Sequence, residues 1–175
     1  MFSGSYVCDP DRIYVLNMKI LLMAVGRTTS EIMRRGIDLY KDRLKYYDAP
    51  VEIKIIEDIK GAKSLTQQRQ KELEGESILR NVTPFDRVVL LDENGREFTS
   101  REFAAFVDKQ MVSGVKRLVF VVGGPYGFSD AVYARADSKL SLSRMTFNHE
   151  MVRLFFIEQL YRAMTIRRGE PYHHD

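Results

Sequence analysis

Short apolar stretches separated by polar ones predict a series of strands. Ile20–Val25, Arg87–Asp92 and Leu118–Val122 are nearly continuous apolar runs that end at glycine or just before an Asn-Gly pair. This pattern is typical of strands buried on both faces. Val51–Glu57 alternates apolar and charged residues, which predicts a strand with one exposed face. Leu140–Leu142 is expected to form one more short strand.

Helical periodicity fills the intervals between these strands. In the first helix Ile32 and Ile37 are expected on the buried face. Thr66–Arg80 is strongly polar, which predicts a helix with a solvated face and few apolar anchors, namely Leu73, Ile78 and Leu79. Thr99–Glu102 is a capping box, in which the threonine and glutamate side chains bind each other's backbone amides. Gly169 is expected to be a left-handed C-cap of the last helix. The helices are expected at Ser30–Tyr46, Thr66–Arg80, Thr99–Ser113, Ser129–Ala136 and His149–Arg167.

Alternating strands and helices indicate an α/β fold with a mostly parallel sheet flanked by helices. The chain has 175 residues, and we assign 18–175 to a single domain. Ligands of such sheets bind beyond the carboxyl ends of the strands. Those ends are Leu90–Gly95, Gly123–Gly127 and Leu142–Asn148, which we expect to face one crevice.

Composition and charge narrow the class of protein. Hydrophobic residues make up 45% and charged residues 29% of the chain, as in ordinary globular proteins. The net charge of +3 permits an RNA partner without requiring one. Cys8 is the single cysteine, so neither an internal disulfide nor a Cys/His zinc site is expected. This pattern fits a reducing compartment, and we expect a cytoplasmic protein.

Residues Met1–Asn17 stand apart from this pattern. They lack the basic start and apolar centre of a signal peptide. Met18 is followed at once by a buried strand and looks like a natural start, so Met1–Asn17 is interpreted as an upstream extension. The alternative is an additional edge strand at Ile13–Leu16.

Taken one by one, the candidate chemical residues have ordinary explanations. Gly123 and Gly124 let the backbone approach a ligand, but the dinucleotide and phosphate-loop fingerprints are absent, and taken alone such a segment is more often a tight turn. Ser141 and Ser143 lack the nucleophile elbow of a serine hydrolase. A histidine at a helix start, such as His149, is more often packed than catalytic.

The tail ends in His173 and His174, and without a further histidine-rich segment we expect no metal site.

A set of ordered motifs nevertheless resembles one family. The motifs are Val-Val-Gly-Gly-Pro-Tyr-Gly at 121–127, Ser-Leu-Ser-Arg-Met-Thr-Phe-Asn-His at 141–149, the helix from 151 to 163, and Arg-Gly-Glu-Pro-Tyr-His at 168–173. Together with the opening at 18–26 they resemble the RlmH family. Its members are bacterial SPOUT-class methyltransferases that modify N3 of a pseudouridine in 23S rRNA. The resemblance covers Met18 to His174.

This resemblance implies a C-terminal trefoil knot, an exception to the usual absence of knots. It implies a homodimer that binds S-adenosyl-L-methionine in the knotted crevice and acts on 23S rRNA in the large subunit or assembled ribosome. The implied cofactor-binding residues are Leu91, Gly123, Gly124, Leu142, Ser143, Arg144, Met145, Thr146, Phe147 and Asn148.

The same resemblance assigns the acceptor chemistry to Arg153, Tyr172 and His173. Methyl transfer depends mostly on positioning, but the weakly acidic N3 proton calls for a base. Our hypothesis is that His173 or Tyr172 takes that proton and that Arg153 binds a phosphate or the base oxygen.

One position departs from the family pattern, where proline is usual and this chain has Asn148. Asparagine can cap the following helix instead. Two alternatives stay open. One is a SPOUT methyltransferase for another RNA base, and the other is a non-catalytic ribosome-binding factor with the same fold. The glycine loop and the Tyr-His tail argue against the second, because a pure binder does not need them.

Overall fold

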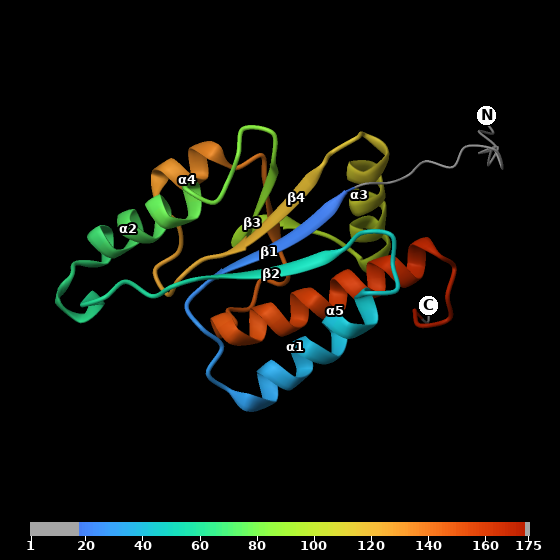
Figure 1. Ribbon diagram of the computed structural model, residues 1–175, viewed down its shortest axis with the longest axis horizontal. Helices are drawn as coiled ribbons and strands as arrows, with labels where there is room; N and C mark the ends of the chain where they lie inside the picture. Colours follow the sequence, from blue (N-terminus) through green and yellow to red (C-terminus); the bar gives the residue numbers. More distant parts are fainter. Residues whose placement is uncertain (1–17, 174–175) are drawn as a thin grey trace.

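A fully parallel five-stranded sheet runs through the molecule, whose computed structural model describes residues 18–173 (Figure 1). The strand order is β2-β1-β4-β3-β5, and every pair of neighbours is parallel. The predicted α/β class is therefore confirmed. The strands are β1 (Lys19–Val25), β2 (Val51–Ile56), β3 (Arg87–Glu97), β4 (Arg117–Val122) and β5 (Ser138–Ser141).

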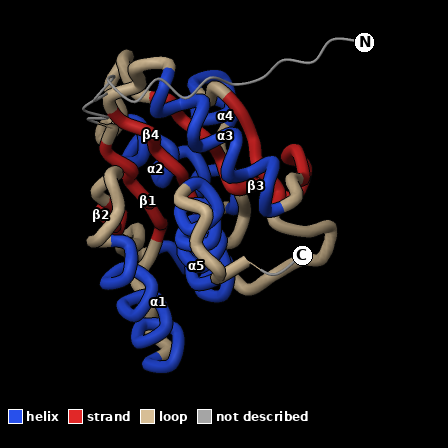
Figure 2. Tube along the Cα trace, turned by 90° about the vertical axis from the view of Figure 1, so that its right-hand side faces the viewer, coloured by secondary structure: helices blue, strands red, loops and turns tan. Residues whose placement is uncertain are grey.

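Helices cover both faces of this sheet (Figures 1 and 2). In β1, Ile20 and Leu22 pack with residues of α1, α3 and α5, whereas Leu21 and Met23 pack with residues of α2 and α4. Successive side chains of a strand point to opposite faces, so this division confirms that β1 is buried on both sides. The helices are α1 (Glu31–Leu44), α2 (Gln67–Leu79), α3 (Ser100–Val112), α4 (Asp130–Arg135) and α5 (His149–Arg167), with a short 3-10 turn at Ala62–Ser64.

The predicted helix starts are largely confirmed by their caps. Glu102 N donates to Thr99 Oγ1 over 3.2 Å, and Thr99 N donates to Glu102 Oε2 over 2.8 Å. Asn148 Oδ1 accepts from Glu150 N at 2.8 Å, so asparagine caps α5 at the position where the family usually has proline. Ser129 occupies the N-cap of α4, but its side chain makes no capping hydrogen bond.

The prediction that the third strand ends at Asp92 is wrong. Strand β3 continues to Glu97, because Leu91 and Arg96 both pair with Leu140 and the segment between them bulges out. A β-carbon added at Gly95 would lie 2.5 Å from the carbonyl carbon of Leu140, so glycine lets the backbone pass β5 closely. The Asn-Gly pair marks this bulge and not the end of the strand. Strand β5 begins and ends earlier than expected, at Ser138–Ser141, because Ser138 and Lys139 already pair with Val89 and Leu90 ahead of the bulge.

Two expectations about helix faces are also corrected. Helix α2 is anchored by Ile78 as expected, but Glu74 and Gly75 are also buried where it packs beside α4, so its polar residues are not all on a solvated face. Ile37 is buried in α1 as expected, but Ile32 is 77% exposed, and no described residue covers it. Gly169 has φ +67°, as expected of a left-handed C-cap.

Several expectations fall outside what this structure can test. Met1–Asn17, the alternative strand at Ile13–Leu16, and His174 lie outside the described residues. The trefoil knot and the single-domain assignment stay predictions. Within 18–173, no helix is long and apolar enough to cross a membrane.

Candidate active site

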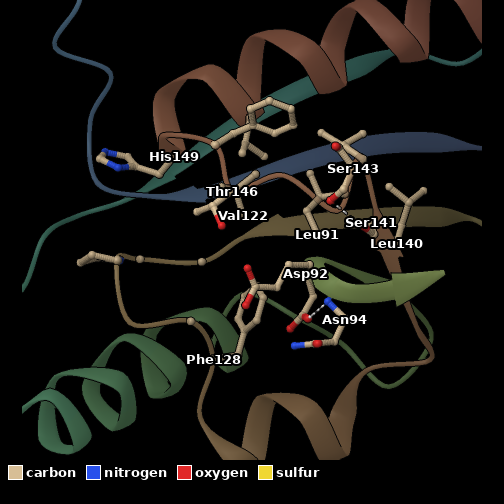
Figure 3. A pocket seen from close by; sticks show the side chains of 18 of the residues that line it. Leu91, Asp92, Asn94, Val122, Phe128, Leu140, Ser141, Ser143, Thr146 and His149 are labelled. Atoms are coloured by element: carbon tan, nitrogen blue, oxygen red, sulfur yellow. Dashed lines mark hydrogen bonds between the residues drawn. The ribbon is translucent and has the colours of Figure 1, made fainter. Parts of the chain in front are cut away.

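A cavity of about 440 Å³ opens at the carboxyl edge of β3, β4 and β5 (Figure 3). In Figure 3, His149 and Thr146 lie on one side of the opening, and Asp92, Asn94 and Phe128 lie on the other. The expected convergence of the three strand ends is therefore present. The lining residues from these ends are Leu91, Asp92, Glu93, Asn94, Val122, Gly123, Gly124, Pro125, Tyr126, Gly127, Phe128, Leu140, Ser141, Leu142, Ser143, Met145, Thr146 and Phe147, with Tyr133, His149 and Val152 from neighbouring helices.

The glycine loop after β4 forms a tight turn that exposes backbone to the cavity. Gly127 N donates to Gly124 O at 3.1 Å, and Gly127 has φ +78°, a conformation that favours glycine. Gly124 has no room for a side chain, because an added β-carbon would lie 2.9 Å from Cδ of the Glu74 side chain. The turn and the ligand-facing loop proposed from the sequence are the same structure.

The second loop, from Leu142 to Asn148, is held by its own hydroxyl groups. Ser141 Oγ donates to Ser143 O at 2.9 Å, and Met145 N donates to Ser143 Oγ at 3.0 Å. The ring of Phe147 packs edge-on against Phe155 of α5, with centroids 5.1 Å apart. These contacts fix the loop between β5 and α5.

Two of the expected cofactor residues do not line the cavity. The Arg144 side chain is 90% exposed and pairs with Glu97 at 3.1 Å, while Asn148 caps α5. The other expected residues, Leu91, Gly123, Gly124, Leu142, Ser143, Met145, Thr146 and Phe147, all line it.

The bulge of β3, part of the strand end Leu90–Gly95 expected at the crevice, does line the cavity, and it is joined there by Tyr133 of α4, which the sequence did not indicate. Tyr133 OH donates to Asp92 Oδ2 at 2.6 Å, and Asn94 N donates to Asp92 Oδ1 at 2.8 Å. Burial, followed by the bond to Asp92, raises the pKa of Tyr133 to about 12. Tyr133 therefore stays a hydrogen-bond donor at neutral pH and fixes the carboxylate at the cavity wall.

Arg153 is buried behind the start of α5 and does not line the cavity. Its side chain is fully enclosed, with Nη2 donating to Val25 O at 2.6 Å and Nη1 donating to Thr28 Oγ1 at 2.9 Å. Glu150 binds the same loop after β1, because its Oε1 accepts from Thr29 N at 2.8 Å. These backbone and hydroxyl bonds lower the pKa of Glu150 to about 2. The first turns of α5 thus anchor the segment between β1 and α1.

The tail residues lie along α1 and α5, away from the cavity lining. Tyr172 OH donates to Glu158 Oε1 at 3.1 Å and lies 3.4 Å from Tyr40 OH. His173 Nδ1 is 3.5 Å from Arg162 Nη1. Within one chain, Tyr172 and His173 both lie beside Arg162, Arg153 lies apart from them, and none of the three residues assigned to the acceptor chemistry lines the cavity.

A smaller aromatic cavity of about 240 Å³ lies next to the first. It shares Leu142 and Phe147 with the large cavity, and it includes Glu158, the carboxylate that binds Tyr172. This second cavity thus lies between the strand-end loops, with which it shares residues, and the tail, whose Tyr172 binds Glu158. Its lining residues are Phe98, Phe103, Leu140, Ser141, Leu142, Phe147, Phe155, Glu158 and Gln159.

Comparison with known proteins identifies the family. Residues 18–173 match the family model described as "Predicted SPOUT methyltransferase". The chain belongs to the SPOUT methyltransferase family. The resemblance drawn from the four motifs is confirmed.

Curated relatives of this SPOUT methyltransferase carry a more specific name. "Ribosomal RNA large subunit methyltransferase H" of Parabacteroides distasonis is 55% identical over 158 residues, covering 90% of this chain and 100% of the relative. The protein of the same name from Christiangramia forsetii is 55% identical over 157 residues, covering 90% and 99%. A solved structure of a probable methylase from Haemophilus influenzae aligns over 92% of this chain and 72% of its own, at 16% identity and a TM-score of 0.47, a likeness too distant to bear on the site.

Among its described residues, this SPOUT methyltransferase contains no group of three or more histidine, cysteine, aspartate or glutamate side chains that could hold a metal ion.

Proposed function

We propose that this SPOUT methyltransferase transfers a methyl group from S-adenosyl-L-methionine to N3 of a pseudouridine in 23S rRNA. The observation that carries the proposal is the cavity at the ends of β3, β4 and β5, lined by eight of the ten residues expected to bind the cofactor. The relatives named as large-subunit rRNA methyltransferases match along almost their whole length and support the choice of substrate.

The residues of the cavity fit such a methyl donor. A volume of about 440 Å³ lies within the usual range for small-molecule sites, about 300–1,000 Å³. Leu91, Val122 and Leu142 offer apolar walls for a base, and Asp92 offers a fixed acceptor for hydroxyl groups. The backbone of Gly123 and Gly124 can contact the ligand without side chains in between. When bound, the donor would supply a methyl group activated by a positively charged sulfur.

The acceptor side of the reaction is proposed to involve the tail. Burial, then the bonds to Tyr40 and Glu158, raises the pKa of Tyr172, so its phenol stays protonated at neutral pH. His173 is therefore the better candidate to take the N3 proton. The aromatic cavity that includes Glu158 is the proposed place for the acceptor base, since rings such as Phe147 and Phe155 can stack on it.

Arg153 is proposed to act by position. Burial lowers the pKa of Arg153, although the carboxylates of Glu150 and Asp58 oppose that effect. Its bonds to Val25 and Thr28 hold the loop after β1 in place. A direct contact with an RNA phosphate would require these bonds to break, so we favour positioning over the phosphate contact suggested by the sequence.

A homodimer is part of the same proposal. Ile32 and Leu39 of α1 and Phe155 of α5 are exposed by 77%, 49% and 38%, and α1 and α5 lie side by side (Figure 1). Apolar side chains exposed on adjacent helices are typical of a surface that another chain covers. A second copy is the proposed occupant. Action on ribosomes would place the enzyme in the cytoplasm, as expected from its cysteine content.

The decisive experiment is a methylation assay on large subunits and 70S ribosomes from cells lacking this modification, with free 23S rRNA in parallel. The modified nucleoside is identified by mass spectrometry, and donor binding is measured by calorimetry. We expect 3-methylpseudouridine on ribosomal particles. Methylation of another base would favour the alternative SPOUT activity, and failure to bind S-adenosyl-L-methionine would favour the non-catalytic ribosome-binding factor.

A further inference from the structure

Glu74 is an unusual residue for the polar helix α2. Its side chain is only 3% exposed, and it shares the buried face of the helix with Gly75 and Ile78. Its Oε1 accepts from Gln70 Nε2 at 2.8 Å, while Oε2 has no hydrogen-bond partner among the described residues. A buried carboxyl oxygen without a partner is costly, so its presence calls for an explanation.

The carboxyl group of Glu74 lies next to Gly124 in the glycine loop. A β-carbon added at Gly124 would lie 2.9 Å from Glu74 Cδ, with Oε2 nearer still. Gly124 lines the large cavity and Glu74 does not. The carboxyl group therefore lies beside Gly124 and outside the cavity lining.

Gly75, the next residue of α2, determines how closely the helix packs near this contact. A β-carbon added at Gly75 would lie 3.1 Å from Cβ of Ser129 and 3.2 Å from Val132. Helix α2 thus packs closely against the far end of the loop and against α4, which leaves Glu74 little freedom to turn elsewhere. Glycine inside a helix weakens it, so its presence here is explained by the packing.

The surroundings raise the pKa of this side chain above that of an exposed glutamate. Burial raises the pKa of Glu74, the bond from Gln70 opposes this, and the carboxylate of Asp58 adds to the rise. A neutral carboxyl group carries both a donor and an acceptor, as an amide does. It can therefore bond to either a carbonyl or an amide of a nearby backbone.

We propose that Glu74 is a positioning residue for the methyl donor. Its carboxyl group holds the Gly124 backbone in the conformation that the donor requires. The idea rests on the proposed function, since it assumes that the glycine loop binds S-adenosyl-L-methionine. In this arrangement Oε2 bonds to the loop backbone when the loop settles on the ligand. Glu74 itself touches neither the donor nor the RNA.

The test compares two variants of almost equal size, Glu74→Gln and Glu74→Met. Glutamine keeps a donor and an acceptor, whereas methionine fills the same space without either. Glu76→Met, on the exposed side of the same helix, is the control. The dissociation constant of S-adenosyl-L-methionine and the melting temperature are measured for each purified full-length protein, together with KM for the donor and kcat on ribosomes.

We expect Glu74→Gln and Glu76→Met to bind the donor within about threefold of the parent, and Glu74→Met to bind about tenfold more weakly. Glu74→Met should melt no lower than the parent, because it removes a buried unpartnered oxygen. Its KM for the donor should rise with little change in kcat.

Equal donor affinity in Glu74→Met and Glu74→Gln would overturn the proposal, as would an equal loss in both. If the parent protein itself fails to bind the donor, the proposed function fails instead, and the two failures are thereby distinguished.

Discussion

The large cavity and the tail are formed by different kinds of chemical groups. The cavity is formed by glycine backbone, apolar walls and loop hydroxyls at the ends of strands. The tail is held by side chains: rings of Tyr161 and Tyr172 lie 4.8 Å apart, and Arg168 lies 4.3 Å from the ring of Tyr47. A site made of backbone depends on the register of the sheet, whereas a site made of side chains depends on residue identity. The two regions should therefore fail separately when they are changed.

The largest expected effect is on the tail. His173→Ala should lower kcat on ribosomes by about 100- to 10,000-fold, the usual contribution of a general base, without changing donor affinity. Single-turnover methylation and calorimetry measure the two quantities. Added imidazole should restore part of the rate, and Tyr172→Phe should lose less activity than His173→Ala. Full turnover by His173→Ala would remove it as the base and make His149, which lines the cavity, the next residue to test.

The corresponding test of the cavity is a substitution in the glycine loop. Gly124→Ala introduces a β-carbon against Glu74 and should weaken donor binding by about 2 kcal/mol, because the loop must shift. Calorimetry with S-adenosyl-L-methionine gives this value. Gly114→Ala is the control, since it has φ +78° but nothing within 4 Å. It should cost stability of about 1 kcal/mol without affecting donor binding. Equal donor affinity in both variants would show that the loop shape is irrelevant to the cavity.

A third change tests the start of α5, which lies between the two regions. Glu150→Gln should lower the free energy of unfolding at pH 7 by about 2 kcal/mol, because charge-assisted bonds to the loop after β1 are lost.

The contribution of Glu150 should depend on pH in a defined direction. Its pKa is lowered from 4.5 to about 2 in the folded chain. The stabilisation is therefore fully present above pH 4.5 and is lost as the pH falls toward 2. Urea unfolding of the parent and Glu150→Gln at pH 7 and pH 3 should show a difference that shrinks at the lower pH. A constant difference would mean that the charge of Glu150 is not what matters.

The smallest effect is expected at the base of the tail. Tyr47 OH donates to Glu170 Oε2 at 2.5 Å, and Tyr47→Phe removes this bond while keeping the ring. Hydrogen exchange at 168–173 should become faster by an amount equivalent to about 1 kcal/mol. Donor affinity should stay the same. Protection in the glycine loop serves as the internal control, and a loss there would mean that the two regions are coupled.

Much of the fold could be predicted because local and global signals agree. The apolar runs placed β1 and β4, and the capping residues Thr99 and Asn148 placed the starts of α3 and α5. The order of the strands could not be predicted, since β3 lies between β4 and β5 through pairings far apart in the sequence. The bulge in β3 was missed because Asn-Gly signals a turn whether or not the strand resumes after it.

The site was predicted less completely. The three loops were named from strand ends and family motifs, but the roles of Tyr133 and Asp92 at the wall depend on how α4 packs beside β3. Glu74 was hidden in a polar helix, where only the adjacent Gly75 hinted at close packing. The burial of Arg153 was equally hidden, because a single arginine on a helix usually faces water.

The bulge of β3 has a consequence for how this enzyme can change over time. Leu140 is the partner of Leu91 before the detour and of Arg96 after it, so the register of β3 shifts while β5 runs on without a break, and the intervening segment is a loop inserted in the strand. Such a segment can gain, lose or exchange residues while the surrounding sheet keeps its alignment. Glu93 and Asn94, next to the anchored Asp92, are therefore the part of the cavity mouth most open to exchange in directed evolution toward a different ligand fit.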